Sequence, residues 1–323
     1  MRIVFLGTPE FAVPSLRVLL ASAHEICAVF SQPDRPAGRG HRLHSPPVKV
    51  LAQDAGVPVY QPEKIRDERN RPLFEAFNPD FIVVVAYGQI LPLWLLRSAR
   101  VAPINVHASL LPQYRGAAPV IWAILRGESV TGVTTMLMDE QLDTGDILLM
   151  RQVPIPENMT GGELAGNLAQ IGAEMLVPSI EGLSEGSVTP VPQDHTRASW
   201  APRLTKDQAW ISWDRNASEI HNQIRALNPR LFACATYQGQ RLQVLRSRVS
   251  FASGESALLP GTVRGRTAEG LLVECADGTI LEILEVRPPN RRAVSGCEFA
   301  VGARLKTGSR PFSPLESTRG DSC

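Results

Sequence analysis

Two polar side chains end an apolar run in residues 104–119, INVHASLLPQYRGAAP. Asn105 and His107 are two residues apart, so in a strand they project from the same face. An Asn amide is a neutral donor suited to the oxyanion that forms in acyl transfer. A His beside it moves a proton near neutral pH, or donates a second hydrogen bond when charged. The pair therefore indicates acyl transfer, although polar residues at strand ends often only satisfy backbone groups.

An acidic segment, MDEQLDTGD, follows at residues 138–146. A catalytic His usually needs an orienting carboxylate, and Asp143 lies in a turn that could direct it back to the strand end. The alternatives for such a segment are a solvated turn and a cation site. Ser109 lacks the G-x-S-x-G context of a nucleophile. We therefore expect direct transfer between two bound substrates, with Asn105, His107 and Asp143 as candidates.

The first half of the chain must position these residues, and it alternates strands with helices. Residues 81–86 are apolar throughout, which is typical of a central parallel strand covered on both faces. This alternation predicts an α/β fold with a doubly wound, Rossmann-like, mainly parallel sheet, whose ligands bind at the carboxyl ends of the strands. The first strand–helix turn has only Gly7 where a dinucleotide site needs G-x-G-x-x-G. Strands are expected at 2–7, 25–30, 58–61, 81–86, 104–107 and 132–138, and helices at 11–23, 48–56 and 162–183.

The second half changes character after Gly186, where Pro, Ser and Thr predict a linker. A helix is expected at 217–227, followed by short strands at 233–237, 242–250, 261–264, 270–275 and 280–286, with Asp277-Gly278 as a hairpin turn. Five short strands predict a small OB-like β-barrel. The expected domains are therefore 1–189 (catalytic), 190–208 (linker), 209–310 (OB-like) and 311–323 (tail).

Charge is distributed unevenly along the 323 residues, whose net charge is +1. Residues 1–202 carry 16 Lys and Arg against 20 Asp and Glu, whereas residues 203–310 carry 16 against 10. The basic second half indicates a polyanionic partner, with a solvated surface of mixed sign as the alternative.

The chain has no apolar run long enough to span a bilayer and no signal-peptide layout. Its five cysteines form no C-x-x-C pair, which argues against a disulfide framework or a zinc site. We expect a cytoplasmic protein that uses no metal and does not bind membranes.

Several motifs together resemble the folate-dependent formyltransferase family. They are FLGTPEFA at 5–12, the segment 30–50, VVAYGQILP at 84–92, NVHASLLP with LDTG downstream, and RLTKDQAWISW at 203–213. The resemblance covers nearly the whole chain. The PDRPAGRG and RGAAP segments are similar to the tRNA-specific branch. Gln141 stands where the family usually has Gly.

The resemblance implies that Asn105, His107 and Asp143 are catalytic. The formyl donor would be 10-formyltetrahydrofolate, and the acceptor would be the α-amino group of methionyl-initiator tRNA. Residues expected at the folate are Ser109, Leu110, Leu111 and Pro112, with Tyr87, Gln89, Ile90 and Leu91.

By composition alone, residues 32–47 would be a long, exposed, flexible loop; the resemblance implies that this loop reaches the tRNA acceptor stem through Arg35, Arg39 and Arg42. The resemblance also implies that residues 209–310 bind the tRNA body, with phosphate contacts at Arg246, Arg248, Arg264, Arg266, Arg291 and Arg292. A monomer is expected. Two alternatives remain: a transferase with a small amine acceptor, such as an amino sugar nucleotide or glycinamide ribonucleotide, and a non-enzymatic RNA-binding protein.

Overall fold

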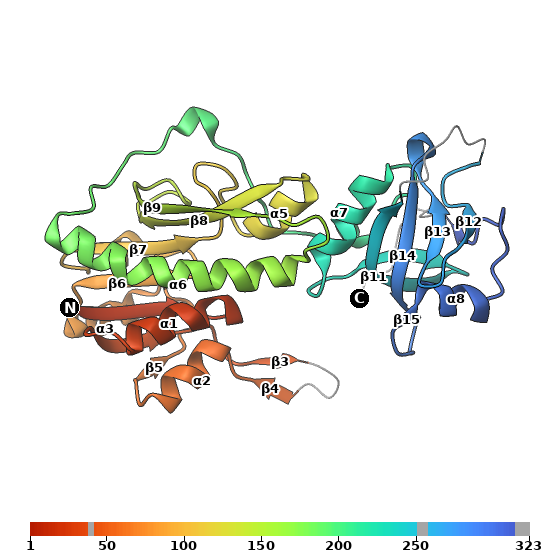
Figure 1. Ribbon diagram of the computed structural model, residues 1–323. Helices are drawn as coiled ribbons and strands as arrows, with labels where there is room; N and C mark the ends of the chain where they lie inside the picture. The colour runs from red at the N-terminus through yellow and green to blue at the C-terminus, as the bar shows by residue number, and fades with distance from the viewer. Residues whose placement is uncertain (38–41, 251–257, 314–323) are drawn as a thin grey trace. The chain divides into compact units, whose positions relative to one another are not determined.

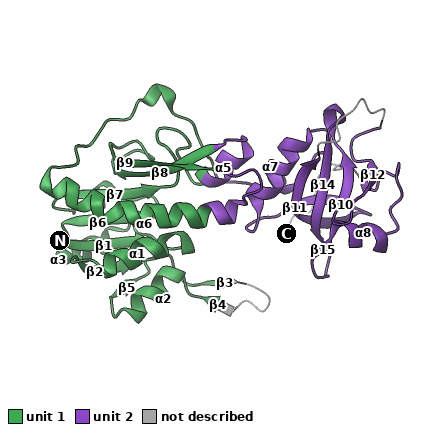
Figure 2. Cartoon of the chain, in the orientation of Figure 1, with its two compact units in different colours: residues 1–119, 130–154, 165–202 green, residues 120–129, 155–164, 203–323 purple. Residues whose placement is uncertain are grey.

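The computed structural model describes residues 1–37, 42–250 and 258–313, which form two compact units (Figure 2). Unit 1 comprises residues 1–119, 130–154 and 165–202, and unit 2 comprises residues 120–129, 155–164 and those from 203 onward. Unit 2 thus includes two short segments from within residues 1–189. The long helix α6, Gly161–Glu185, has its first four residues in unit 2 and the rest in unit 1.

Unit 1 is built on one sheet with the strand order β5-β2-β1-β6-β7-β8-β9 (Figure 1). The first five strands are parallel, and β8 and β9 are antiparallel to their neighbours. The mainly parallel, doubly wound sheet predicted from the sequence is therefore confirmed. The strands are β1 (Arg2–Gly7), β2 (Glu25–Phe30), β5 (Val59–Tyr60), β6 (Phe81–Val85), β7 (Ala102–His107), β8 (Val130–Leu137) and β9 (Ile147–Pro154).

Helices cover both faces of this sheet, which explains why β6 is apolar throughout. On one face, Phe74 and Leu95 pack with Val4 and Ile82 in a buried cluster. On β7 and β8, α6 approaches so closely that a Cβ on Gly172 would lie 2.7 Å from Val106. The helices are η1 (Glu10–Ala12), α1 (Val13–Leu20), α2 (Pro47–Asp54), η2 (Glu68–Asn70), α3 (Arg71–Phe77), α4 (Leu93–Leu96) and η3 (His195–Arg197).

The strand order reverses between β1 and β6, because the chain proceeds from β1 through β2 to β5 and then returns to the other side of β1. Such a reversal opens a crevice at the carboxyl ends of the strands. Here the Thr8 hydroxyl, just after β1, donates to the Tyr87 carbonyl, just after β6, at 2.9 Å. Asn105 and His107 end the next strand, β7. These predicted site residues therefore lie at the carboxyl ends of β6 and β7, next to the point where the strand order reverses.

The sequence predicted a long loop at residues 32–47, but part of this segment forms two strands. Strands β3 (Arg35–Ala37) and β4 (Arg42–His44) form a hairpin in which Arg35 pairs with His44. Asp34 anchors its base by accepting from Lys49 Nζ at 2.7 Å and from Gln61 Nε2 at 2.8 Å. These bonds, that of Lys49 first, lower the pKa of Asp34. Strand pairing was missed because Pro and Gly dominate the segment.

Unit 2 contains an antiparallel sheet with the order β12-β13-β14-β11-β10-β16, and β15 pairs with β14. Backbone hydrogen bonds of 2.8 Å join Val263 on β12 to Gly308 and Ser309, which precede β16. The elements are α5 (Pro119–Leu125), η4 (Lys206–Ala209), α7 (Ala217–Leu227), β10 (Ala233–Tyr237), β11 (Gln240–Ser250), β12 (Val263–Arg266), β13 (Leu271–Glu274), η5 (Ala276–Gly278), β14 (Ile280–Arg287), β15 (Val294–Ser295), α8 (Gly296–Gly302) and β16 (Phe312–Ser313).

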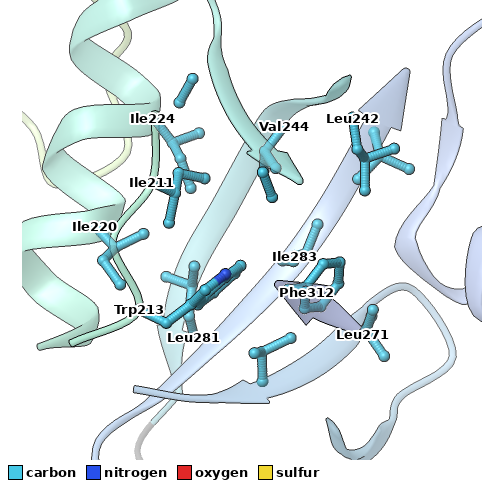
Figure 3. Close-up of a cluster of buried hydrophobic side chains, with 14 of the residues drawn as sticks. Ile211, Trp213, Ile220, Ile224, Leu242, Val244, Leu271, Leu281, Ile283 and Phe312 are labelled. Atoms are coloured by element: carbon cyan, nitrogen blue, oxygen red, sulfur yellow. The ribbon is translucent and has the colours of Figure 1, made fainter. Parts of the chain in front are cut away.

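The core of unit 2 lies between α7 and this sheet (Figure 3). Ile220 and Ile224 of α7 are buried in one cluster with strand residues such as Val244 and Ile283. The hairpin predicted at Asp277-Gly278 is confirmed, since both residues have positive φ (58° and 67°) between the antiparallel strands β13 and β14. Across the described ranges, no helix is both long and apolar enough to cross a bilayer.

The buried carboxylate of Asp80 fixes the entry to β6. Its Oδ2 accepts from the Arg2 backbone N–H at 2.7 Å, and its Oδ1 accepts from Arg100 Nε at 2.9 Å. The Arg2 amide, followed by the Arg100 guanidinium, lowers the pKa of Asp80. A depressed folded-state pKa contributes stability that is present above the unfolded value and lost as the pH falls through the folded value.

We therefore expect Asp80→Asn to lower the free energy of unfolding by roughly 1.5–3 kcal/mol at pH 7, as expected for lost hydrogen bonds to a charged group. The difference from the unmodified protein should shrink below about pH 4, where unfolded Asp begins to hold its proton. Thermal unfolding from pH 3 to pH 7 measures both effects. Asp54→Asn, at an exposed carboxyl of α2, is the matched control. A constant difference across this pH range would contradict the assignment.

Candidate active site

The end of β7 supplies the first two site residues. Asn105 and His107 are 9% and 6% exposed, and they occupy alternate strand positions, so they face the same side of the sheet. Val106 between them points to the opposite face, where it meets α6 at Gly172. Packing of Val106 under the helix therefore fixes the direction in which the two polar side chains project.

Both ring nitrogens of His107 have a defined neighbour. Nε2 lies 2.9 Å from the carbonyl oxygen of Tyr114. Because a carbonyl can only accept, Nε2 carries the hydrogen in this contact. Nδ1 lies 3.7 Å from Oδ1 of Asp143, an ion-pair distance rather than a hydrogen bond. Tyr114 has a positive φ of 59°, so a left-handed turn after β7 directs its carbonyl at the ring.

Asp143 reaches His107 from the loop between β8 and β9. Its Oδ2 accepts the Gly116 backbone N–H at 2.8 Å, and its own φ is 57°. The loop closes on itself because the Thr144 hydroxyl donates to Asp139 Oδ1 at 2.6 Å. Gln141 is not among the residues with positive φ, and it is exposed, so its side chain is accommodated where the family usually has Gly.

Two glycines permit the close backbone approaches in this region. A Cβ on Gly145 would lie 2.1 Å from the carbonyl oxygen of Leu137. Gly116 has a φ of +120°, and a Cβ there would lie 2.8 Å from the carbonyl oxygen of Ala201. Any larger residue at either position would push the Asp143 loop or the turn after β7 out of place.

Gln193 and Arg115 support the Asp143 loop, and sequence reasoning missed both. Gln193 is 6% exposed, and its Nε2 donates to the carbonyls of Asp143 (3.0 Å) and Gly145 (2.7 Å). Its Oε1 accepts from Arg115 Nη2 at 2.6 Å. Gln193 lies in the segment predicted to be a linker, 50 residues from Asp143, and nothing in the local sequence marks it.

The segment after β6 has alternating exposure. Tyr87 is 2% exposed, and burial raises its pKa well above the ordinary value, so its hydroxyl is neutral. Ile90 is 86% exposed, and Leu91 is partly buried. Gln89 is engaged within the protein, since its Oε1 accepts from the Ile65 backbone at 2.8 Å. Of the predicted folate residues here, Ile90 offers an exposed apolar side chain, whereas the Gln89 amide is already occupied.

The turn after His107 is held by its own hydrogen bonds. The Ser109 hydroxyl donates to the Gln113 carbonyl at 2.6 Å, and the Thr134 hydroxyl donates to the Ser109 carbonyl at 2.7 Å. Leu111 is 3% exposed, and Leu110 packs against Gly132. The peptide bond between Leu111 and Pro112 is cis. Ser109 thus shapes this turn through an internal bond.

The arginines predicted to contact tRNA lie in or beside the β3–β4 hairpin. Arg35 is exposed, and its Nη2 donates to Gln32 Oε1 at 3.4 Å. Arg42 begins β4 and pairs with Ala37, while Arg39 lies outside the described residues. In the part of the chain that the structure describes, no three His, Cys, Asp or Glu side chains are grouped as metal ligands would be.

Comparison with protein families identifies both parts of the chain. Residues 1–180 match the formyl transferase family, and residues 203–304 match the formyl transferase C-terminal domain. The chain belongs to the formyl transferase family.

Relatives over its full length are methionyl-tRNA formyltransferases. That of Synechococcus sp. (strain JA-3-3Ab) is 48% identical, over 96% of this chain and 98% of the relative. That of Desulfotalea psychrophila is 44% identical, over 94% of both chains. The prediction of an enzyme of this class is confirmed.

Solved structures share the fold at lower identity. The sugar 3N-formyl transferase WlaRD, solved with dTDP and 5-N-formyl-THF, has a TM-score of 0.66 at 20% identity, covering 90% of this chain and 99% of its own. HypX from Aquifex aeolicus, in complex with tetrahydrofolic acid, has a TM-score of 0.61 at 17% identity, covering 98% of this chain and 50% of its own. At these identities the likeness concerns the fold alone.

The support that Gln193 gives the loop of this formyl transferase is testable without an activity assay. Gln193→Leu keeps the approximate volume but removes both donated bonds, so the buried carbonyl of Gly145 and the partly buried carbonyl of Asp143 lose this donor. We expect backbone amides of residues 139–146 to exchange with deuterium at least about tenfold faster, since about 1.4 kcal/mol of opening free energy is a factor of ten. Residues 81–85 of β6 are the internal control. Unchanged exchange in the loop would contradict this role.

Proposed function

We propose that this formyl transferase moves the formyl group of 10-formyltetrahydrofolate to the α-amino group of methionyl-initiator tRNA. The product would be N-formylmethionyl-tRNA. The observation that carries the proposal is the similarity to methionyl-tRNA formyltransferases, 48% and 44% identical along almost the whole chain. It is supported by the grouping of Asn105, His107 and Asp143 at one sheet edge.

In this proposal, Asn105 stabilises the negative charge that develops on the formyl oxygen. The acceptor amine forms a C–N bond to the formyl carbon, and the carbonyl electron pair moves onto oxygen. A neutral amide held at a strand end is a preorganised donor for that oxygen. The electron pair on oxygen then re-forms the carbonyl, and the bond from the formyl carbon to the folate nitrogen breaks. The proton of the attacking amine must be moved to that folate nitrogen.

His107 and Asp143 would handle that proton. The Tyr114 carbonyl engages Nε2–H, which leaves Nδ1 of the neutral ring as the basic nitrogen. Nδ1 faces the carboxylate of Asp143 across 3.7 Å, so a proton taken up there would be stabilised by the negative charge. The Gly116 amide keeps the other carboxylate oxygen in place. The proton can then pass to the leaving nitrogen, directly or through water.

The folate would lie in the crevice at the β1–β6 reversal. When bound, it supplies the formyl carbon as electrophile and accepts a proton at the nitrogen that carried it. The exposed side chain of Ile90 gives a flat heteroaromatic ring an apolar surface. The internally bonded turn at Ser109 and the anchored segment at Tyr87 would present fixed backbone groups on either side. No metal is required for these steps.

The tRNA acceptor end would be contacted by Arg35 of β3 and Arg42 of β4, and by Arg39, which lies outside the described residues. Arginine suits phosphates and unstacked bases because its planar fork donates several hydrogen bonds. The basic second half of the chain would bind the tRNA body. We further propose a monomer that acts in the cytoplasm.

The proposal is tested by a formylation assay with 10-formyltetrahydrofolate and charged initiator tRNA, charged elongator tRNA, an amino sugar nucleotide or glycinamide ribonucleotide. We expect transfer to charged initiator tRNA.

The same assay tests the catalytic residues. Asn105→Ala should lower kcat by about 10²–10³, the usual cost of losing one oxyanion donor. Asp143→Asn should lower kcat by roughly 10²–10⁴, as expected for lost proton handling. Asp54→Asn is the control for the charge change. Transfer to small amines alone would refute the proposal.

A second assay separates the hairpin from the folate site. We expect Arg39→Ala to lower kcat/KM for charged tRNA by at least about tenfold, the effect of losing about 1.4 kcal/mol of binding. KM for the folate should stay within about twofold. Lys64→Ala, at an exposed cation elsewhere, is the matched control. Equal losses for both substrates would remove the role of the hairpin.

A further inference from the structure

Arg225 on α7 is a buried cation that forms no ion pair within 4.0 Å among the described residues, although the carboxylate of Glu157 acts on it from a greater distance. It is 6% exposed, and no Asp or Glu oxygen among them lies within 4.0 Å of its guanidinium. Nε donates to Asn222 Oδ1 at 2.9 Å, and Nη1 donates to the carbonyls of Pro156 (3.2 Å) and Met159 (3.3 Å). All three acceptors are neutral. An unpaired buried charge is costly, so its presence calls for an explanation.

Arg225 borders a cavity of about 160 Å³ that lies wholly within unit 2. About 10–15 Å³ of such volume suffices for one water, so this space can hold a tetrahedral oxyanion and its hydration. Arg246, Arg248 and Asn158 also border it, and no Asp or Glu is among its lining residues. In the described structure, Nη2 of Arg225 donates no hydrogen bond.

The other groups that line the cavity form no ion pair with Arg225. Arg246 pairs with Glu163 at 3.5 Å, and Arg248 pairs with Glu282 at 2.5 Å, so both acids are already engaged by other arginines. His221 is buried 3.1 Å from the carbonyl of Glu157 and 3.0 Å from the Ser247 hydroxyl. Burial lowers the pKa of His221, which favours its neutral form. Arg225 is therefore the cation at the cavity that lacks a direct acidic contact among the described residues, since Glu157 acts on it only from beyond ion-pair distance.

We infer that this cavity binds a phosphate group, which Arg225 Nη2 anchors and Asn158 and Arg246 meet at the rim. A guanidinium fork matches the geometry of phosphate oxygens and forms strong charge-assisted hydrogen bonds with them. The surrounding residues 203–310 carry a surplus of six positive charges, which attracts such a ligand. The phosphate could come from the tRNA backbone, which rests on the proposed function, or from free phosphate or a nucleotide, which does not.

The first test measures thermal unfolding of the full chain in phosphate and in acetate at equal ionic strength. Binding to the folded state alone raises the unfolding temperature with ligand concentration. We expect a saturable rise in phosphate and none in acetate. Since Arg225 also holds two carbonyls, its replacement could prevent folding, and Asn158→Asp is the better variant. A carboxylate at residue 158 would occupy the anion's place, raise the unfolding temperature without phosphate, and abolish the phosphate response.

Asn290→Asp is the matched control, because it makes the same charge change at an exposed position of unit 2 and should keep the phosphate response. Absence of a phosphate response in the unmodified protein, or the same response in Asn158→Asp, would overturn the inference. Neither measurement involves formyl transfer, so failure here is separate from failure of the proposed function.

The second test identifies the source of the phosphate through tRNA affinity in chloride buffers of increasing concentration. If a tRNA phosphate occupies the cavity, Asn158→Asp weakens binding about tenfold relative to Asn290→Asp, and the slope of log affinity against log salt falls by about one. Added phosphate would compete with tRNA in the unmodified protein. If only the phosphate response is lost and tRNA affinity is unchanged, the site stands and its ligand is free phosphate or a nucleotide.

Discussion

The hydrogen bond from the Gly116 amide to the carboxylate of Asp143 joins two segments 27 residues apart in the chain. Together with the bonds that run from Arg115 through Gln193, it fixes the turn after β7 and the loop between β8 and β9 at the sheet edge. The bond requires unusual backbone on both sides, since Gly116 has a φ of +120° and Asp143 a φ of 57°. Left-handed backbone at a non-glycine residue is costly, and it persists where surrounding contacts determine it. Here the left-handed residue, Asp143, is itself one of the proposed catalytic residues.

Those surrounding contacts form a buried polar chain. The Arg115 guanidinium holds the Gln193 side-chain oxygen, and the Gln193 amide group holds the carbonyls of Asp143 and Gly145. Each bond inside the protein is stronger than it would be in water, and each unmade bond would be costly. The chain of bonds therefore selects one loop conformation. The Asp143 carboxylate faces His107 because Gln193 holds the main-chain carbonyl of Asp143 and the Gly116 amide holds its Oδ2.

Local patterns in the sequence account for elements whose cause is local. Helix α7 was predicted with its observed bounds, and in the structure Asn216 and Glu219 form a capping box at its start. Strand β9 was missed because three consecutive exposed residues, Met150, Arg151 and Gln152, interrupt its alternation. The types of the three proposed catalytic residues were also readable. The support from Gln193 was not, because a contact across 50 residues leaves no periodic signal in either segment.

The anion-binding arginines were also hard to predict from the sequence, because a count of charged residues does not show which arginines are paired with acids. Three of the predicted phosphate contacts, Arg246, Arg248 and Arg264, have acidic partners within 3.5 Å. The partners of the last two, Glu282 and Glu274, are buried, so these pairs are fixed by the fold. A polyanion must then compete with those acids, which weakens the attraction that the surplus of positive charge implies. Arg225, absent from the sequence prediction, forms no such ion pair among the described residues, and the nearby Glu157 acts on it only from a greater distance. Tertiary structure therefore decides where the basic half can hold an anion.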